Sequence, residues 1–104
     1  MPGISRDKDL TSTGHGCSPV AQCIASATSV FVNGIRVARQ GDRIKTHFIE
    51  NPAYPPPPKC IPHTTAKINS GSRSVFAEGI SVARRFDSAD LGAMIGASRN
   101  VFAG

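Results

Sequence analysis

Apolar and polar positions follow the same pattern in two short stretches of the chain. Residues 30–37 read Val-Phe-Val-Asn-Gly-Ile-Arg-Val, and residues 75–82 read Val-Phe-Ala-Glu-Gly-Ile-Ser-Val. A run of β-branched and aromatic residues, a glycine-containing pair and a second alternating run are typical of a β-hairpin. We therefore predict two hairpins, with Gly34 and Gly79 in turns that require a positive φ.

The two hairpins belong to a longer repeated unit. After each hairpin the chain continues with Val-Ala-Arg-x-x-Asp, and residues 100–104 repeat the start of the unit as Asn-Val-Phe-Ala-Gly. We predict units at about 15–42, 60–87 and 92–104 within a single domain, residues 1–104. Arg6 and Asp9 repeat the Arg-x-x-Asp spacing in a polar, extended lead-in. Repeats of roughly 20–50 residues indicate one supersecondary unit that is stacked or arranged around an axis.

The segments between the units are less regular. Residues 48–59 contain four successive prolines, which favour polyproline II and cannot donate ladder hydrogen bonds. This stretch is predicted to be a protruding insertion loop. Residues 88–91 are expected to form one helical turn, capped by Ser88 or Asp87. No other segment favours a helix, so the predicted fold class is all-β.

A chain of 104 residues with 39% apolar residues and no Trp has a small interior, so a metal, a disulfide or a partner is expected to stabilise it. The odd number of cysteines argues against a disulfide framework, although Cys17 and Cys23 could pair locally. No apolar run approaches the roughly 20 residues of a membrane span, and the chain does not start with a secretory leader. We expect a product made in the cytoplasm.

The net charge of +5 and the pI of about 9.6 raise the question of an anionic partner. The basic residues are spread thinly, without a cluster of Lys and Arg interleaved with aromatic residues. The charge is therefore interpreted as a solvated surface, and no nucleic acid is expected as a partner. The alternative function is a zinc-stabilised basic module that binds nucleic acid.

The histidines and cysteines suggest a metal site. Shifting the second unit onto the first places Cys60 on His15, while His47 follows the first unit and His63 stands three residues after Cys60. Three imidazoles and one thiolate suit a closed, tetrahedral zinc, which is structural because no position is open to water. Cys17 is the alternative to Cys60. A Cys-His pair acting as nucleophile and base has no third group to orient it, so no enzyme is predicted.

The repeated motifs resemble those of the PAAR-repeat proteins. The resemblance rests on Val-Phe-Val-Asn-Gly at 30–34 with Val-Ala-Arg and Gly-Asp after it, and on Gly-Ser-Arg-Ser-Val-Phe at 71–76 with Val-Ala-Arg after it. It departs at Phe86, which stands where the family's Gly-Asp has its glycine. The resemblance implies a small conical β-fold with pseudo-threefold character. It also implies one structural zinc near the pointed end, held by His15, His47, Cys60 and His63.

The function implied by the resemblance is mechanical. PAAR-repeat proteins cap and sharpen the trimeric β-helical spike of contractile injection machines, which is either the valine-glycine repeat spike of type VI secretion or the central spike of a phage tail. The implied protein is a non-enzymatic, membrane-piercing tip, bound to the spike homotrimer in a 1:3 ratio. It would be made in the bacterial cytoplasm and assembled at the end of the spike. A docked effector and a transiently contacted target envelope are the other implied partners.

Overall fold

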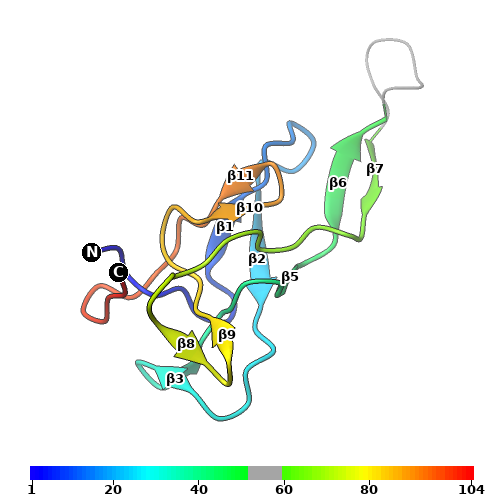
Figure 1. The fold of residues 1–104 in the computed structure, drawn as a ribbon. Coiled ribbons are helices and arrows are strands. Elements are labelled where there is room, and N and C mark those ends of the chain that lie inside the picture. Colours follow the sequence, from blue (N-terminus) through cyan, green and yellow to red (C-terminus); the bar gives the residue numbers. More distant parts are fainter. Residues whose placement is uncertain (52–59) are drawn as a thin grey trace.

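The computed structural model describes residues 1–51 and 60–104, and these contain short β-strands and no helix (Figure 1). The prediction of an all-β fold is confirmed. The strands are β1 (Leu10–Ser12), β2 (Val20–Ile24), β3 (Phe31–Val32), β4 (Ile35–Arg36), β5 (Arg43–Ile44), β6 (His47–Glu50), β7 (Cys60–His63), β8 (Phe76–Ala77), β9 (Ile80–Ser81), β10 (Ser88–Ala89) and β11 (Gly92–Ala93). No helix among these residues is long and apolar enough to cross a membrane.

Both hairpins predicted from the repeated pattern are present. Strand β3 pairs with β4 and β8 pairs with β9, each antiparallel and joined by a two-residue turn. The turn residues all have positive φ, 56° and 75° at Asn33 and Gly34, and 54° and 81° at Glu78 and Gly79. Such a pair of left-handed residues matches the twist of the flanking strands.

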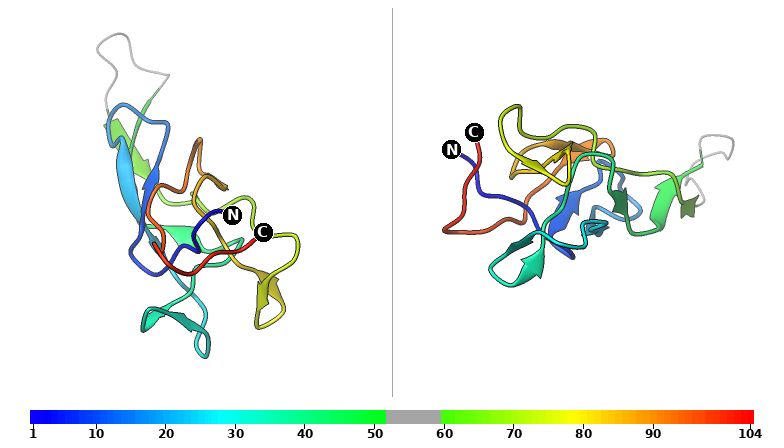
Figure 2. Two further views of the ribbon diagram at one scale, coloured as in Figure 1. Left: turned by 90° about the vertical axis from the view of Figure 1, so that its left-hand side faces the viewer. Right: turned by 60° about the horizontal axis from the view of Figure 1, so that its bottom comes forward.

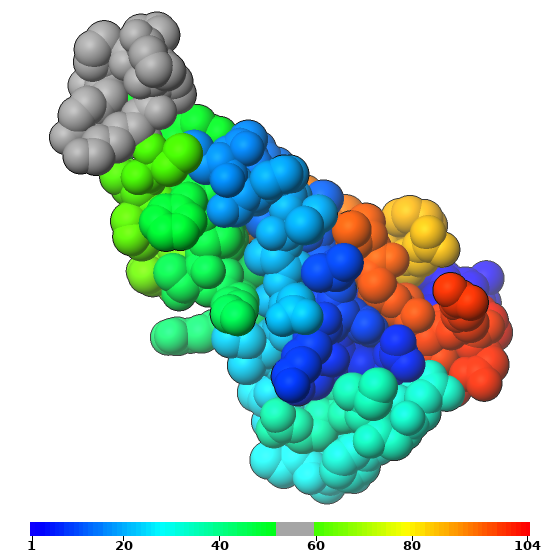
Figure 3. Space-filling model, turned by 180° about the vertical axis from the view of Figure 1, so that it is seen from behind, coloured from blue at the N-terminus to red at the C-terminus, as the bar shows by residue number. Residues whose placement is uncertain are grey.

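The molecule is elongated, with extents of 45 × 24 × 22 Å. The antiparallel pair β6–β7 forms one end, which we call the narrow end (Figures 1 and 3). Strand β3, the β8–β9 hairpin and both chain termini lie at the other end, which we call the wide end (Figure 2). The three-stranded sheet β1-β2-β5 lies between the two ends.

A closed ring of three backbone hydrogen bonds relates three parts of the chain. The amide of Ser5 donates to the carbonyl of Ala83 at 2.9 Å, Ala83 donates to Ala38 at 2.8 Å, and Ala38 donates back to Ser5 at 3.0 Å. Ala38 and Ala83 occupy the same position in the two repeated units, so Ser5 occupies this position in a third. The ring gives the fold its pseudo-threefold character.

Both ends of the chain contribute to the third unit. The amide of Ile4 donates to Val101 O at 2.9 Å, just as Val37 donates to Val30 O within the first unit. Counting along the repeats from these pairs places Gly104 at the position of Asn33 and Met1 at the position of Gly34. Residues 94–104 followed by 1–9 thus correspond, without a gap, to residues 23–42 and 68–87. The third unit, truncated in the sequence, is complete in the structure.

The Arg-x-x-Asp motif forms the same hairpin-like clasp in all three units. In each, the arginine amide donates to the aspartate Oδ2 at 2.8 Å, as in Arg6–Asp9, Arg39–Asp42 and Arg84–Asp87. In the last of these pairs the guanidinium also bonds the carboxylate, and these hydrogen bonds raise the pKa of Arg84. Arg6 and Asp9 therefore share with the repeated motif the same hydrogen bond as well as the same spacing.

Each turn at the wide end is fastened to a neighbouring unit. The Glu78 carboxylate accepts from Ser29 and Thr28 and pairs with Arg39 Nη1 at 3.1 Å. The hydrogen bond from the Ser29 hydroxyl is the main cause of the lowered pKa of Glu78. At the equivalent positions, the Asn33 carboxamide bonds Ser98 and Asn100, and Gly104 O accepts from Ser72. These contacts tie the three units into one body.

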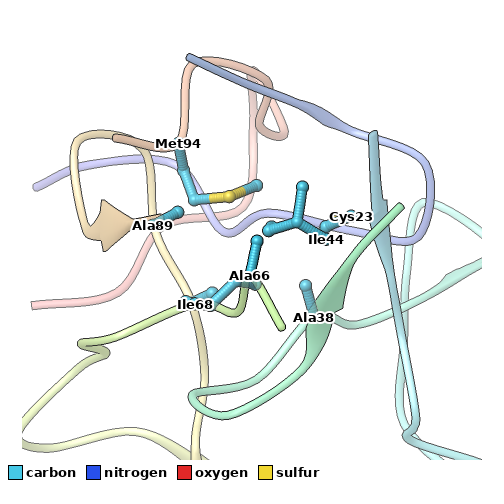
Figure 4. Close-up of a cluster of buried hydrophobic side chains, with 8 residues drawn as sticks. Cys23, Ala38, Ile44, Ala66, Ile68, Ala89 and Met94 are labelled. Carbon is cyan, nitrogen blue, oxygen red and sulfur yellow. The ribbon is translucent and has the colours of Figure 1, made fainter. Parts of the chain in front are cut away.

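The core consists of two small clusters made largely of short side chains. One lies around the middle of the molecule and includes Cys23, Ile68 and Met94, which are equivalent positions of the three units (Figure 4). The other lies toward the wide end and includes Val32, Val37, Ala77, Val82 and Ile4. Apolar burial stabilises in proportion to buried area, so these clusters contribute little toward the narrow end.

Two sequence-based expectations change in the structure. Residues 48–50 belong to β6, so the predicted insertion loop starts later than residue 48; its proline-rich part, 52–59, lies outside the described residues. Residues 88–91 form no helical turn. They form part of the β10–β11 hairpin, whose turn contains Asp90 with a φ of 54°.

Candidate metal centre

Four side chains that could hold a metal ion meet where the β6–β7 hairpin joins the rest of the molecule. They are His15, His47, His63 and Asp90, and one ligand atom of each lies within 4.8 Å of the other three. The side chains of His47 and Asp90 are each only 4% exposed. Such a convergence of buried imidazoles and a carboxylate is typical of a metal centre.

Separate parts of the fold bring these side chains together. His47 and His63 face each other as the first pair of the β6–β7 ladder. His15 lies in the loop between β1 and β2, which turns at Gly14 with a φ of 77°. Asp90 lies in the β10–β11 turn, where its amide donates to Lys67 O at 2.9 Å. The cluster thus connects the narrow end to two loops of the central part.

The distances between the donor atoms fit a tetrahedral ion. Asp90 Oδ2 lies 2.8 Å from His47 Nε2, 3.2 Å from His15 Nε2 and 3.6 Å from His63 Nδ1. His63 Nδ1 lies 3.4 Å from His47 Nε2. Zinc–ligand bonds of about 2.0–2.1 Å imply ligand–ligand separations of roughly 3.3 Å in a tetrahedron. These four distances lie close to that separation, and all the donor atoms lie within 4.8 Å of one another, so the cluster has the size of a site for one such ion.

One contact fixes the proton of His47. Its Nδ1 lies 2.8 Å from the carbonyl oxygen of Lys45. A carbonyl can only accept, so Nδ1 carries a proton, and Nε2 is the atom that faces the cluster and could bind a metal. A metal-binding histidine is generally oriented in this way by a partner outside the metal's own ligands.

The structure brings the three predicted histidines together, but it does not bring Cys60 to them. The prediction assumed that Cys-x-x-His forms a tight turn, whereas residues 60–63 form strand β7. In an extended strand, residues three apart lie about 10 Å from each other, with side chains on opposite faces. Cys60 consequently pairs with Glu50 at the far end of the β6–β7 ladder.

Cys60 instead forms a disulfide with Cys17. The expectation of no disulfide is wrong. The alternative of a local Cys17–Cys23 pair does not hold either, because Cys23 is a free, buried thiol. Burial is the main cause that raises the pKa of Cys23 to about 12. The disulfide joins the loop that contains His15 to the strand that contains His63. It therefore cross-links the same two segments as the candidate metal centre.

Glu50 also binds the loop that contains His15 and Cys17. Its carboxylate accepts a hydrogen bond from the amide of Cys17 at 2.8 Å. Hydrogen bonds from its own amide and from those of Cys17 and Gly16 lower the pKa of Glu50. The loop is thus held at His15, at the Cys17 amide and at the Cys17 sulfur.

Sequence reasoning missed Asp90. The predicted ligand set was drawn from histidines and cysteines, and residues 88–91 were expected to be helical. The repeated units contain a signal, because Asp90 comes shortly after the Arg-x-x-Asp motif of the second unit, as His47 does after that of the first. The spacing differs, because Asp90 stands three residues after Asp87 and His47 five residues after Asp42. The repeat alignment itself pairs Asp90 with Lys45, so it indicates the segment but not the residue.

Fold and site together define a small all-β repeat protein that has pseudo-threefold symmetry and, toward its narrow end, a cluster of side chains that could hold a metal ion. The family model of the PAAR motif matches residues 13–97. The chain belongs to the PAAR-motif family. No curated protein matches it.

Membership of this family gives the broad function. PAAR-motif proteins are structural spike-tip proteins rather than enzymes, and they associate with valine-glycine repeat spike proteins. The family supports a spike-tip role in a contractile injection system, at a type VI spike or a phage tail tip.

Proposed function

We propose that this chain is the non-enzymatic, membrane-piercing tip of a contractile injection machine, with its wide end capping the end of one trimeric β-helical spike. One tip would bind one trimer. The observation that carries the proposal is a set of three exposed phenylalanines, Phe31, Phe76 and Phe102, which are 55%, 57% and 48% exposed. They occupy the same position in the three units.

These phenylalanines are informative because the same large apolar side chain is exposed at all three copies of one position, and exposed apolar groups that recur together can mark an interaction surface. Phe31 and Phe76 lie on β3 and β8 at the wide end, and Phe102 pairs with Gly3 beside the termini. A partner with threefold symmetry presents three copies of one surface. Three equivalent apolar side chains on a single chain match the symmetry of such a partner.

The test is complex formation with the β-helical spike trimer of the same genome. Native mass spectrometry should find one tip per three spike chains. Replacing Phe31, Phe76 and Phe102 together by Ser should abolish the complex. Phe48→Ser is the matched control, because Phe48 is 51% exposed but lies on β6 at the narrow end. A triple variant that still binds the trimer would refute the proposed surface.

We also propose that the metal is one structural zinc bound by His15, His47 and His63, with Asp90 in place of the predicted Cys60. The metal would supply a cross-link where the interior is too thin for an apolar core. Elemental analysis should find about one zinc per chain. Asp90→Asn should lose it and Cys60→Ser should retain it. The opposite pattern would assign the fourth ligand to Cys60.

A further inference from the structure

One set of equivalent backbone contacts at the wide end has different side chains in the three units, and one of these contacts borders a hollow. In each unit an amide next to the Arg-x-x-Asp arginine donates to the hairpin of another unit. Asp7 donates to Arg36 O at 2.8 Å, Gln40 to Ser81 O at 2.9 Å, and Arg85 to Gly3 O at 2.8 Å. These three pairs are equivalent, so their side chains can be compared directly.

In the first of these pairs the side chains form an ion pair. Arg36 Nη2 lies 3.5 Å from the carboxylate of Asp7. In the third pair the acidic position is Arg85 and the basic position is Gly3, which has no side chain. The second pair, Gln40 and Ser81, is uncharged. The third pair therefore has a guanidinium where the first has a carboxylate, and no side chain where the first has a guanidinium.

A cavity of about 590 Å³ lies at this place. Arg85 and Arg99 line it together with the apolar side chains of Phe86, Ile95 and Phe102, and none of the described residues that line it is acidic. Within the described part of the chain, neither arginine makes an ion pair; Arg85 only stacks on Phe86, 4.9 Å from the ring centre. Guanidinium groups are the side chains best suited to bind a carboxylate, and here two of them line one cavity beside apolar side chains.

We propose that this cavity binds a carboxylate of the spike trimer, from an acidic side chain or a chain end, when the wide end docks. The inference rests on the proposed function and adds to it a specific contact in the interface. Phe102 belongs both to the proposed apolar surface and to the cavity wall, so the two are continuous. The negative charge of the partner would replace the missing Asp7-like group and complement both arginines.

The site has a consequence for symmetry. The cavity combines Arg85 of the second unit with Arg99 of the third, and this combination occurs at one place in the chain, so a tip has one such site, whereas a homotrimer offers three equivalent carboxylates. The tip can dock in any of three equivalent orientations, and in each of them it uses one of the three carboxylates. The contact would add affinity without changing the 1:3 ratio.

The test compares the dissociation constants of tip variants for the spike trimer of the same genome, at 50 and 300 mM NaCl. Arg85→Ala combined with Arg99→Ala should weaken binding at least tenfold at low salt and flatten the salt dependence. Arg73→Ala is the matched control, because Arg73 is exposed and occupies the position of Arg99 in the second unit. It should change binding less than twofold. Arg85→Lys, which keeps the charge but loses the bidentate geometry, should fall between wild type and the double variant.

The outcomes separate the two proposals. Equal binding of the wild type and the double variant, with equal salt dependence, would overturn the carboxylate site and leave the spike-tip function intact. A wild-type chain that does not bind the trimer would overturn both. A similar loss in Arg73→Ala would show that general positive charge acts, and would also overturn the site. Thermal unfolding of each variant should match that of the wild type, since the side chains removed are exposed.

Discussion

Removal of the Cys17–Cys60 disulfide should cost the metal-free protein about 4 kcal/mol of unfolding free energy. The bond closes a loop with a sequence separation of 43 residues. The chain-entropy relation gives an entropy of roughly 13 cal/mol/K for such a loop, which amounts to about 4 kcal/mol at 25 °C. In a domain of this size, each kcal/mol corresponds to about 4–8 °C in Tm, so a loss on the order of 20 °C is expected.

The assay is thermal unfolding with a chelator present, comparing the wild type with the Cys17→Ser, Cys60→Ser double variant. Reducing the wild type with a phosphine should lower its Tm to that of the double variant. Cys23→Ala is the control: it removes a buried thiol that is in no disulfide, so reduction should lower its Tm by as much as it lowers that of the wild type.

Equal Tm values of the oxidised wild type and the double variant would refute the reasoning. They would mean either that the two sulfurs are not joined in solution or that the unfolded chain is already restricted. With zinc restored, the double variant should still bind the metal, because neither cysteine belongs to the group of donor atoms.

The remaining predictions concern the three units. The third residue of each Arg-x-x-Asp clasp has a positive φ, 68° at Lys8, 89° at Gly41 and 74° at Phe86. A non-glycine residue in this conformation costs about 1–2 kcal/mol. In urea unfolding, Lys8→Gly should therefore stabilise the protein by about 0.5–1 kcal/mol. Gly41→Ala should destabilise it by about 1 kcal/mol, although the added Cβ meets no atom within 4 Å. Opposite signs would show that these turns are not left-handed. A circular permutant can be made that joins Gly104 directly to Met1 and begins at Gly34. It should fold with an unchanged circular dichroism spectrum, because the joined residues correspond to Asn33-Gly34. An unfolded permutant would contradict the gapless equivalence of the units.

Local sequence patterns predicted those parts of the fold, the hairpins, that depend on residues close together in the chain. The hairpins at 30–37 and 75–82 follow from alternation and from the turn residues, and both are present. The Arg-x-x-Asp spacing at Arg6 and Asp9 is visible in the sequence, but it was assigned to a lead-in, and the third unit was predicted at 92–104 alone. Its completion by residues 1–9 depends on pairing between the two ends of the chain, for example Gly3 with Phe102, which no local window contains.

The candidate site was predicted in part for a similar reason. The three histidines were chosen by residue type, and the structure places them together. Cys60 was assigned by assuming a turn where the chain is extended, and the same sulfur was instead within reach of Cys17. Asp90 was missed because an aspartate in a short polar segment is ordinarily a cap or a surface residue. Its role depends on the β10–β11 hairpin, which local propensity does not favour over a helical turn.

The ring formed by Ser5, Ala38 and Ala83 has a consequence for how this molecule can vary. In a homotrimer each substitution appears three times, so a residue that suits one place must be tolerated in the other two. Here the three copies are encoded separately, and each can mutate alone. The same architecture can therefore keep Phe31, Phe76 and Phe102 alike where a symmetric surface is useful, and elsewhere accumulate differences that occur only once, such as the histidine cluster, the disulfide and the Arg85 hollow. A single chain that contains three copies of one unit can thus have the approximate symmetry of a trimer while its three copies differ in sequence.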